Sequence, residues 1–150
     1  MQQVYYTLFP SDAEKLSDGY SYKYELPTEF FVSKLKRQII VEDYQFWEYT
    51  SDGENDIKYY EARSGISLYG DFADESISVK SYGDKVSQNL NFIGLSNNDG
   101  TWIKQKVFNF NRRQKFITIH FKDLLGNNLS NVDEDGKPKF LFCVVLKLIY

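Results

Sequence analysis

The C-terminal segment of the chain, residues 140–150 (FLFCVVLKLIY), is apolar at almost every position, and Lys147 carries its only charge. A strand with one face in water alternates apolar and polar side chains, because successive side chains point to opposite faces. In this segment both alternating sets are apolar. We therefore expect a strand covered on both faces, either by a second layer of the same protein or by another subunit.

Two segments near the N-terminus also predict strands. Residues 2–9 (QQVYYTLF) are rich in aromatic and β-branched side chains and stop at Pro10. Residues 20–26 (YSYKYEL) alternate with a period of two, which places tyrosines and a leucine on one face. The segment between them, 11–19 (SDAEKLSDG), has room for a single helical turn ended by Gly19.

The stretch 31–49 (FVSKLKRQIIVEDYQFWEY) has an apolar spacing that suits a helix about as well as strands. Residues 39–41 are β-branched and residues 44–49 are mostly aromatic, and both features favour strands. We predict strands here, although the spacing alone leaves a helix open.

From residue 51 onward, short apolar runs alternate with glycine-containing turns, at intervals of about ten residues. The sequence NNDG (97–100) suits a tight hairpin turn, and residues 101–110 and 115–121 flank NRRQ as a second expected hairpin. We predict an all-β fold, a single-domain antiparallel β-sandwich over residues 1–150. A jelly roll is one option for its winding, and we expect at most one short helix. The apolar runs are 57–62, 66–69, 77–82 and 90–95.

Composition supports strands and excludes some partners. Aromatic residues make up 17% of the chain, with 12 Tyr and 12 Phe. The formal net charge of −3 gives no overall attraction to nucleic acid or to an anionic membrane, so we expect direct contact with neither. No apolar run approaches the roughly 20 residues of a membrane helix. The opening MQQVYYTLFP lacks the basic and apolar regions of a signal peptide, so we expect a reducing, aqueous compartment.

The chain has one histidine, His120, and one cysteine, Cys143, so it contains the two residue types that a catalytic Cys–His dyad requires. Cys143 lies in the middle of the most apolar segment, where a thiol usually packs and has a raised pKa. His120 falls on the polar face of its expected strand. We therefore predict structural roles for both residues, and we expect neither a catalytic residue nor a cofactor nor enzymatic activity.

Metal-binding patterns are weak in this sequence. A structural zinc site needs four closely spaced Cys or His ligands, which the sequence lacks, and it also lacks the glycine-rich phosphate-binding motifs. Asn131, Asp133 and Asp135 before Gly136 match the opening of a calcium loop. The twelfth position, which should be a bidentate Glu, is Phe142. We favour a solvated turn and assign no metal site, and weak calcium binding stays open.

A set of carboxylates keeps two further interpretations open. Glu42, Asp43 and Glu48 cluster near Trp47, and two well-placed carboxylates suffice for glycoside hydrolysis. Trp102 is a second ring on which a sugar could stack, although Trp in a β protein is more often in the core or at an interface. A carbohydrate- or receptor-binding module is therefore the second interpretation, and a small carboxylate-dependent hydrolase is the third.

Two patterns at the ends of the chain carry a resemblance. The first is an aromatic strand, a Pro-Ser turn, a polar stretch and a strand that ends in Leu-Pro. The second is KFITIHFKDLLGNNLS (115–130), with Asp123 and Gly126 in its turn. These patterns resemble the ends of small virion-associated proteins of Polinton-like and virophage-like DNA viruses, whereas residues 50–110 carry no part of the resemblance. The first pattern is formed by Tyr6, Leu8, Pro10, Ser11, Tyr22, Tyr24, Leu26 and Pro27.

The resemblance implies a β-sandwich that serves as a minor capsid, cement or spike component, with no catalytic residues to carry over. We expect a structural virion component, assembled in the host cytoplasm or nucleus, whose partners are copies of itself or other capsid proteins. Under the second interpretation the partner is a glycan receptor. Because Tyr and Trp dominate protein interfaces, the expected anchors are aromatic, with core filling as the alternative. These candidates are Tyr20, Tyr22, Phe46, Trp47 and Trp102.

Overall fold

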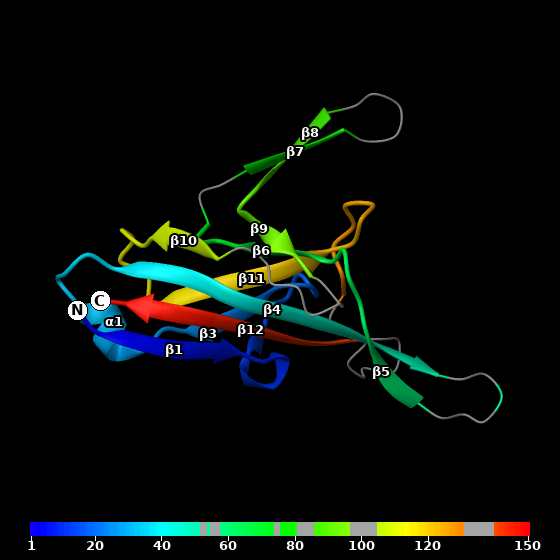
Figure 1. Ribbon diagram of the computed structural model, residues 1–150, viewed down its shortest axis with the longest axis horizontal. Coiled ribbons are helices and arrows are strands. Elements are labelled where there is room, and N and C mark those ends of the chain that lie inside the picture. The colour runs from blue at the N-terminus through cyan, green and yellow to red at the C-terminus, as the bar shows by residue number, and fades with distance from the viewer. Residues whose placement is uncertain (52–53, 55–57, 74–75, 81–85, 97–104, 131–139) are drawn as a thin grey trace.

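A computed structural model of the protein describes residues 1–51, 54, 58–73, 76–80, 86–96, 105–130 and 140–150 (Figure 1). Its helical elements are a 3-10 turn, η1 (Pro10–Asp12), and a short helix, α1 (Thr28–Val32). The strands are β1 (Gln3–Leu8), β2 (Glu14–Lys15), β3 (Tyr22–Glu25), β4 (Gln38–Ser51), β5 (Lys58–Ala62), β6 (Ser67–Gly70), β7 (Ser76–Lys80), β8 (Val86–Leu90), β9 (Phe92–Leu95), β10 (Lys106–Asn109), β11 (Phe116–Lys122) and β12 (Phe140–Ile149).

Two five-stranded antiparallel sheets pack face to face. Sheet A has the order β1-β12-β4-β10, and β5 pairs with the far part of β4. Sheet B has the order β2-β3-β11-β6-β9. In Figure 1, β4 and β12 of sheet A lie in front of β3 and β11 of sheet B, and β7 pairs with β8 in a separate ribbon. The predicted all-β antiparallel sandwich with at most one short helix is confirmed.

The strands pair with the winding of a jelly roll. Strands from the two halves of the chain form a nested ribbon, in which β1 pairs with β12, β3 with β11, β4 with β10 and β6 with β9. The ribbon then folds across itself, so that β12 also pairs with β4 and β11 with β6. This winding produces two packed sheets from one ribbon.

The core lies between the two sheets and is rich in aromatic rings. Even-numbered residues of β12, from Phe140 to Leu148, are buried, whereas its odd-numbered residues are half-buried. Phe121 of β11 faces them from sheet B, with ring centroids 4.6 Å from Phe142 and 5.5 Å from Phe46. The protein's own second layer therefore covers one face of the C-terminal strand, and the other face belongs to the outer surface of sheet A.

Strand β4 carries one more residue than its partner β12. Val145 pairs with Asp43, and the next residue of β12, Leu146, pairs with Val41, so Glu42 is the extra residue of a β-bulge. Odd-numbered residues of β4 face the core before the bulge, and even-numbered residues face it afterwards. This change explains why the sequence shows no single strand period. The strand prediction is confirmed from residue 38 to 49 and is wrong for 31–37, where α1 ends at Val32 and no strand follows before Gln38. The buried positions are Ile39, Val41, Tyr44 and Phe46.

Two further local predictions differ from the structure. In the described part of the expected hairpin, 105–110 and 115–121, the two strands do not pair with each other, because β10 belongs to sheet A and β11 to sheet B. The helical turn expected within 11–19 is present only as the 3-10 turn η1, which ends at Asp12 instead of Gly19 and is followed by the short strand β2. The expected turn at 97–100 lies outside the described residues.

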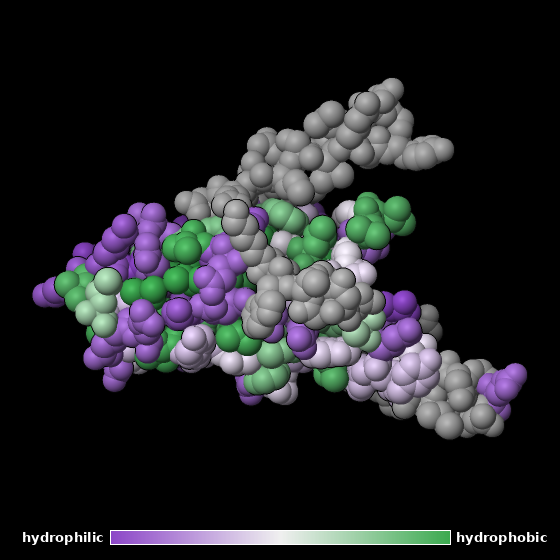
Figure 2. All heavy atoms as spheres, viewed as in Figure 1, coloured by the Kyte–Doolittle hydropathy of each residue, from purple (hydrophilic) through white to green (hydrophobic). Residues whose placement is uncertain are grey.

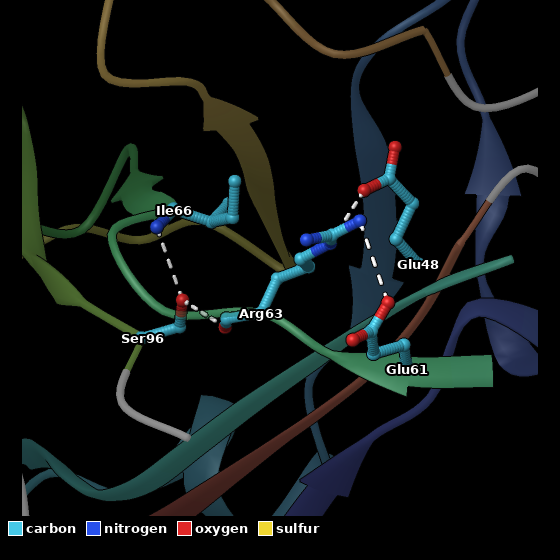
Figure 3. A network of polar contacts seen from close by, with 5 residues as sticks. All are labelled: Glu48, Glu61, Arg63, Ile66 and Ser96. Atoms are coloured by element: carbon cyan, nitrogen blue, oxygen red, sulfur yellow. Dashed lines mark hydrogen bonds and ion pairs between the residues drawn. The ribbon is translucent and has the colours of Figure 1, made fainter. Parts of the chain in front are cut away.

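Arg63 and Ser96 fix the chain where it crosses from β5 in sheet A to β6 in sheet B (Figure 3). Arg63 Nε donates to Glu48 Oε2 at 2.8 Å, and Arg63 Nη2 lies 3.6 Å from Glu61 Oε2. The buried Ser96 hydroxyl accepts from the Ile66 N–H at 3.0 Å and donates to the Arg63 carbonyl at 2.8 Å. Because both roles of this hydroxyl are satisfied, the crossing has a well-defined path.

Candidate interaction surface

The outer face of sheet A is apolar along β12, apart from Lys147, whereas the neighbouring β4 adds Asp43 and the exposed Gln45. It includes Val107 of β10, which is 53% exposed, and Tyr5 of β1, which is 66% exposed. Figure 2 shows apolar side chains lying between polar ones on the face turned to the viewer. An apolar row along a central strand, with exposed apolar residues on the strands beside it, is a candidate for a protein–protein contact. The half-buried residues of β12 on this face are Leu141, Cys143, Val145 and Ile149.

A charged pair interrupts this face at the β-bulge. Lys147 Nζ lies 3.1 Å from Glu42 Oε1, and the two side chains are 21% and 14% exposed. Gln105 Nε2 donates to the other carboxylate oxygen of Glu42. Lys147 Nζ also lies 5.9 Å from the centre of the Tyr5 ring, within reach of a cation–π contact. The Glu42 carboxylate therefore lies on the outer face of the sheet at the bulge, held by a cation and an amide.

Strand β1 is an edge of sheet A and runs along its lower side in Figure 1. Just before it, Gln2 and Tyr150 exchange both backbone hydrogen bonds, at 2.6 and 3.1 Å. Such exchanges recur at every second residue of an antiparallel pair. The continuous register of β1 with β12 therefore turns the N–H and C=O groups of Gln3, Tyr5 and Thr7 away from β12.

The sequence of β1 does nothing to protect this edge. Proteins usually block exposed edges with lysine, proline, a bulge or a covering element. Residues 3–8 (QVYYTL) contain no charge, proline or glycine, and the pairing of β1 with β12 has no bulge. In the part of the chain that the structure describes, no strand pairs with the outward side of β1. The edge is therefore ready to accept another strand.

The aromatic residues expected to anchor a partner differ in burial, and some lie in the core while others lie at the surface. Tyr22 and Phe46 are 1% and 3% exposed and fill the core, so their rings offer no surface to a partner. Tyr20 is half-buried on the outer side of sheet B, where its ring meets His120 at 5.7 Å. Trp47 is half-buried on the outer face of sheet A, beside β5. Trp102 lies outside the described residues.

Sequence reasoning missed two tyrosines that accompany Trp47. Tyr49 pairs with Tyr60 across β4 and β5, and their ring centroids lie 5.1 Å apart. Because Tyr49 follows Trp47 by two residues, both side chains emerge on the same face of β4. Aromatic residues at positions 47 and 49 could have indicated from the sequence that both rings share one face of a strand. The position of Tyr60 beside them could not be predicted, because it depends on the pairing of β5 with β4.

The conceivable Cys–His dyad is not formed. Cys143 lies on the outer face of sheet A, and burial together with the nearby Asp43 raises the pKa of its thiol. His120 lies on the outer face of sheet B, stacked on Tyr69 at 5.0 Å. Burial, assisted by the charge of Lys122, lowers the pKa of His120 to about 4. The two side chains are therefore on opposite sides of the sandwich.

The expected carboxylate cluster is dispersed among structural contacts. Glu42 pairs with Lys147, and Glu48 pairs with Arg63. The Asp43 carboxylate accepts the N–H of the next residue at 2.8 Å. Among the described residues, no group of three or more His, Cys, Asp or Glu side chains is placed to hold a metal ion. The loop 131–136, whose sequence matches the opening of a calcium loop, lies outside the described residues.

Comparisons with known proteins give no indication of the function. No family model, no curated protein and no solved structure matches the chain. Within the described residues, none of the helices has the length and apolar character needed to cross a membrane.

Proposed function

We propose that this protein is a structural component that assembles by joining copies of itself through the free edge of β1, as a subunit or accessory protein of a virion. The observation that carries the proposal is the row of outward backbone groups on Gln3, Tyr5 and Thr7. Unpaired edge groups are a template for another strand, and main-chain hydrogen bonds then provide affinity.

The edge is complementary to itself. In an antiparallel arrangement about a two-fold axis at Tyr5, Tyr5 pairs with Tyr5 of the second copy, and Gln3 pairs with Thr7. Each outward N–H then meets an outward C=O, because all of these residues turn their backbone groups to the same side. A two-fold contact requires this self-complementarity, since the same patch serves both subunits.

Edge pairing also extends the apolar surface. Two copies joined at β1 have one continuous sheet, and the outer faces of both copies lie on the same side of it. Tyr5, which is 66% exposed in the single chain, lies at the centre of that joined face. The extended face is suited to a further contact with capsid proteins, because aromatic residues near the centre of a contact contribute most to binding.

The virion setting rests on the resemblance of the two chain ends and on an analogy of fold. Jelly rolls occur in viral capsids and in lectins, so the winding alone favours neither role. A capsid is built by repeating symmetric contacts between copies of its subunits. This requirement places assembly first among the candidate functions.

Carbohydrate binding is the second candidate, and the aromatic group at the β4–β5 end favours it. Trp47, Tyr49 and Tyr60 lie on one face, and Tyr60 is 41% exposed. Flat rings of this kind present a surface on which the apolar face of a sugar can pack. A glycan that raises the melting temperature of the wild-type protein, but not of a Trp47→Ala variant, would support this candidate.

The experiment for assembly is the solution mass by light scattering over a concentration series. We expect a dimer of twice 17.6 kDa at the higher concentrations. Thr7→Pro removes an outward N–H without breaking a hydrogen bond to β12, because proline is tolerated where an edge N–H faces solvent. This variant should stay monomeric, and Thr7→Val, which keeps the donor, should dimerise. A wild-type protein that is monomeric throughout, or a dimer unaffected by Thr7→Pro, would contradict the proposal.

A further inference from the structure

A depression of about 500 Å³ lies beside α1, between the loop that leads into β4 and the segment that follows β10. We call it the basic pocket. Its cationic lining residues are Lys34, Lys36, Arg37 and Arg113, and none of its lining residues is acidic. Figure 2 shows hydrophilic side chains gathered at the end of the molecule where Figure 1 places α1. Four cations without an acid are unusual in a chain whose formal net charge is −3.

Arg37 anchors the pocket and is 8% exposed. Its guanidinium donates to the Phe31 carbonyl at 3.2 Å and to the Arg112 carbonyl at 2.8 Å. It also lies 5.6 Å from the ring centre of Phe30 and 5.2 Å from that of Phe110. These contacts fix the guanidinium but do not neutralise its charge, because carbonyl oxygens and rings carry no net charge.

The remaining cations are exposed and available. Lys34, Lys36 and Arg113 are exposed, and none of them forms an ion pair with the residues that the structure describes. Other cations of the chain do have acidic partners, as Lys115 has Glu25 at 2.9 Å. The pocket therefore concentrates like charges that repel one another, and a bound anion would relieve that repulsion.

We propose that the basic pocket binds a sulfate or phosphate group. Arginine presents a planar fork of donors that matches an oxyanion, and lysine adds a point charge. The apolar side of the pocket, formed by Phe31, Leu35 and Phe110, suits the carbon skeleton that carries such a group. The preformed Arg37 lowers the cost of binding, because its side chain is already ordered. This site is separate from the β1 edge and does not depend on the assembly proposal.

The test is a titration followed by amide resonances in 15N–1H spectra, at constant ionic strength so that general screening does not change. The probes are inorganic phosphate, inorganic sulfate and a disaccharide with a sulfate ester. We expect saturable shifts confined to residues 33–37 and 110–113. If the sulfated sugar saturates at lower concentration than sulfate, the natural source is an ester-linked group, and equal affinities indicate that the anion alone is recognised.

Substitutions test whether the cations of the basic pocket bind the anion. Lys36→Ala/Arg113→Ala removes two exposed side chains and should weaken binding by at least about tenfold, since charge-assisted hydrogen bonds are the stronger kind. Lys15→Ala is the matched control, because Lys15 is an exposed lysine on β2, and it should leave the affinity unchanged. The proposal is overturned if no probe gives saturable shifts, or if the double variant binds as tightly as the control.

Discussion

Lys147 on β12 forms an ion pair with Glu42 on β4, at the point where β4 holds one residue more than its partner strand. Regular alternation from Ile39 and Val41 would put Asp43 on the core side, and the extra residue of the bulge lets Glu42 and Asp43 both lie on the outer face. The pair therefore makes a charged residue acceptable within the apolar surface of sheet A.

This pair predicts a coupled effect on stability. Glu42→Gln leaves the ammonium group of Lys147 without its carboxylate, and we expect a loss of about 1–2 kcal/mol, between the values for exposed and fully buried pairs. Lys147→Met should cost a similar amount. The double variant should recover part of the loss, because neither charge is then left alone. Urea unfolding of the four proteins gives the coupling energy, and strictly additive losses would show that the pair is not coupled.

The environment of Tyr44 leads us to expect that replacing it by phenylalanine does not destabilise the protein. Its ring is buried against Phe121, at a centroid distance of 5.7 Å, and burial raises its pKa well above the usual value. Its hydroxyl finds no hydrogen-bond partner in the described part of the chain. Tyr44→Phe should therefore leave stability unchanged or raise it by about 1 kcal/mol, because an unsatisfied buried hydroxyl is removed.

Tyr24→Phe is the matched control for this prediction. The Tyr24 hydroxyl donates to the Phe9 carbonyl at 2.6 Å, and the ring is 3% exposed. Removing this hydroxyl should cost about 1 kcal/mol. Thermal or urea unfolding compares the two variants directly, and a Tyr44→Phe variant that loses as much as Tyr24→Phe would show that the Tyr44 hydroxyl has a partner.

His120 predicts a loss of stability in mild acid. Burial and the charge of Lys122 lower its pKa from the ordinary 6.5 to about 4, against a smaller opposing effect of Asp18. The folded protein therefore binds fewer protons than the unfolded chain, and the stabilisation present above pH 6.5 is lost as the pH falls toward 4. Between pH 7.5 and pH 5 this residue should remove about 2 kcal/mol.

His120→Phe isolates this contribution, since a phenyl ring can take the same place between Tyr69 and Tyr20. Free energies of unfolding measured at pH 7.5 and pH 5 should differ less in the variant than in the wild type. Equal differences in the two proteins would mean that His120 titrates normally in the folded state.

The sandwich could be predicted from the sequence, but the winding could not. Short alternating runs and regular turn residues indicate strands locally, and they hold for β5, β6, β9 and β11. Which strands become neighbours depends on contacts across the whole chain. The link between Phe110 and Phe116 looks like a hairpin turn in the sequence, and only the placement of β10 and β11 in different sheets shows otherwise.

The candidate site was predictable only in part. An aromatic residue suits a core and an interface equally well, so the choice of Tyr22 and Phe46 as anchors could not be tested against the sequence. Their burial follows from the opposite sheet, where Phe142 faces Tyr22 and Phe121 faces Phe46 across the core. The free edge of β1 was not visible at all, because being an edge is a property of the sheet and not of the strand.

The most direct measurement of edge pairing is disulfide cross-linking in a Cys143→Ser background. About the proposed axis, Tyr5 pairs with Tyr5 of the second copy in a hydrogen-bonded position, where Cα atoms lie about 5.5 Å apart, within the range for a disulfide. Tyr5→Cys should therefore form a covalent dimer under mild oxidation. Thr7→Cys is the matched control and should not, because its pairing residue is Gln3. Equal cross-linking of both variants, or none of Tyr5→Cys, would contradict assembly through β1.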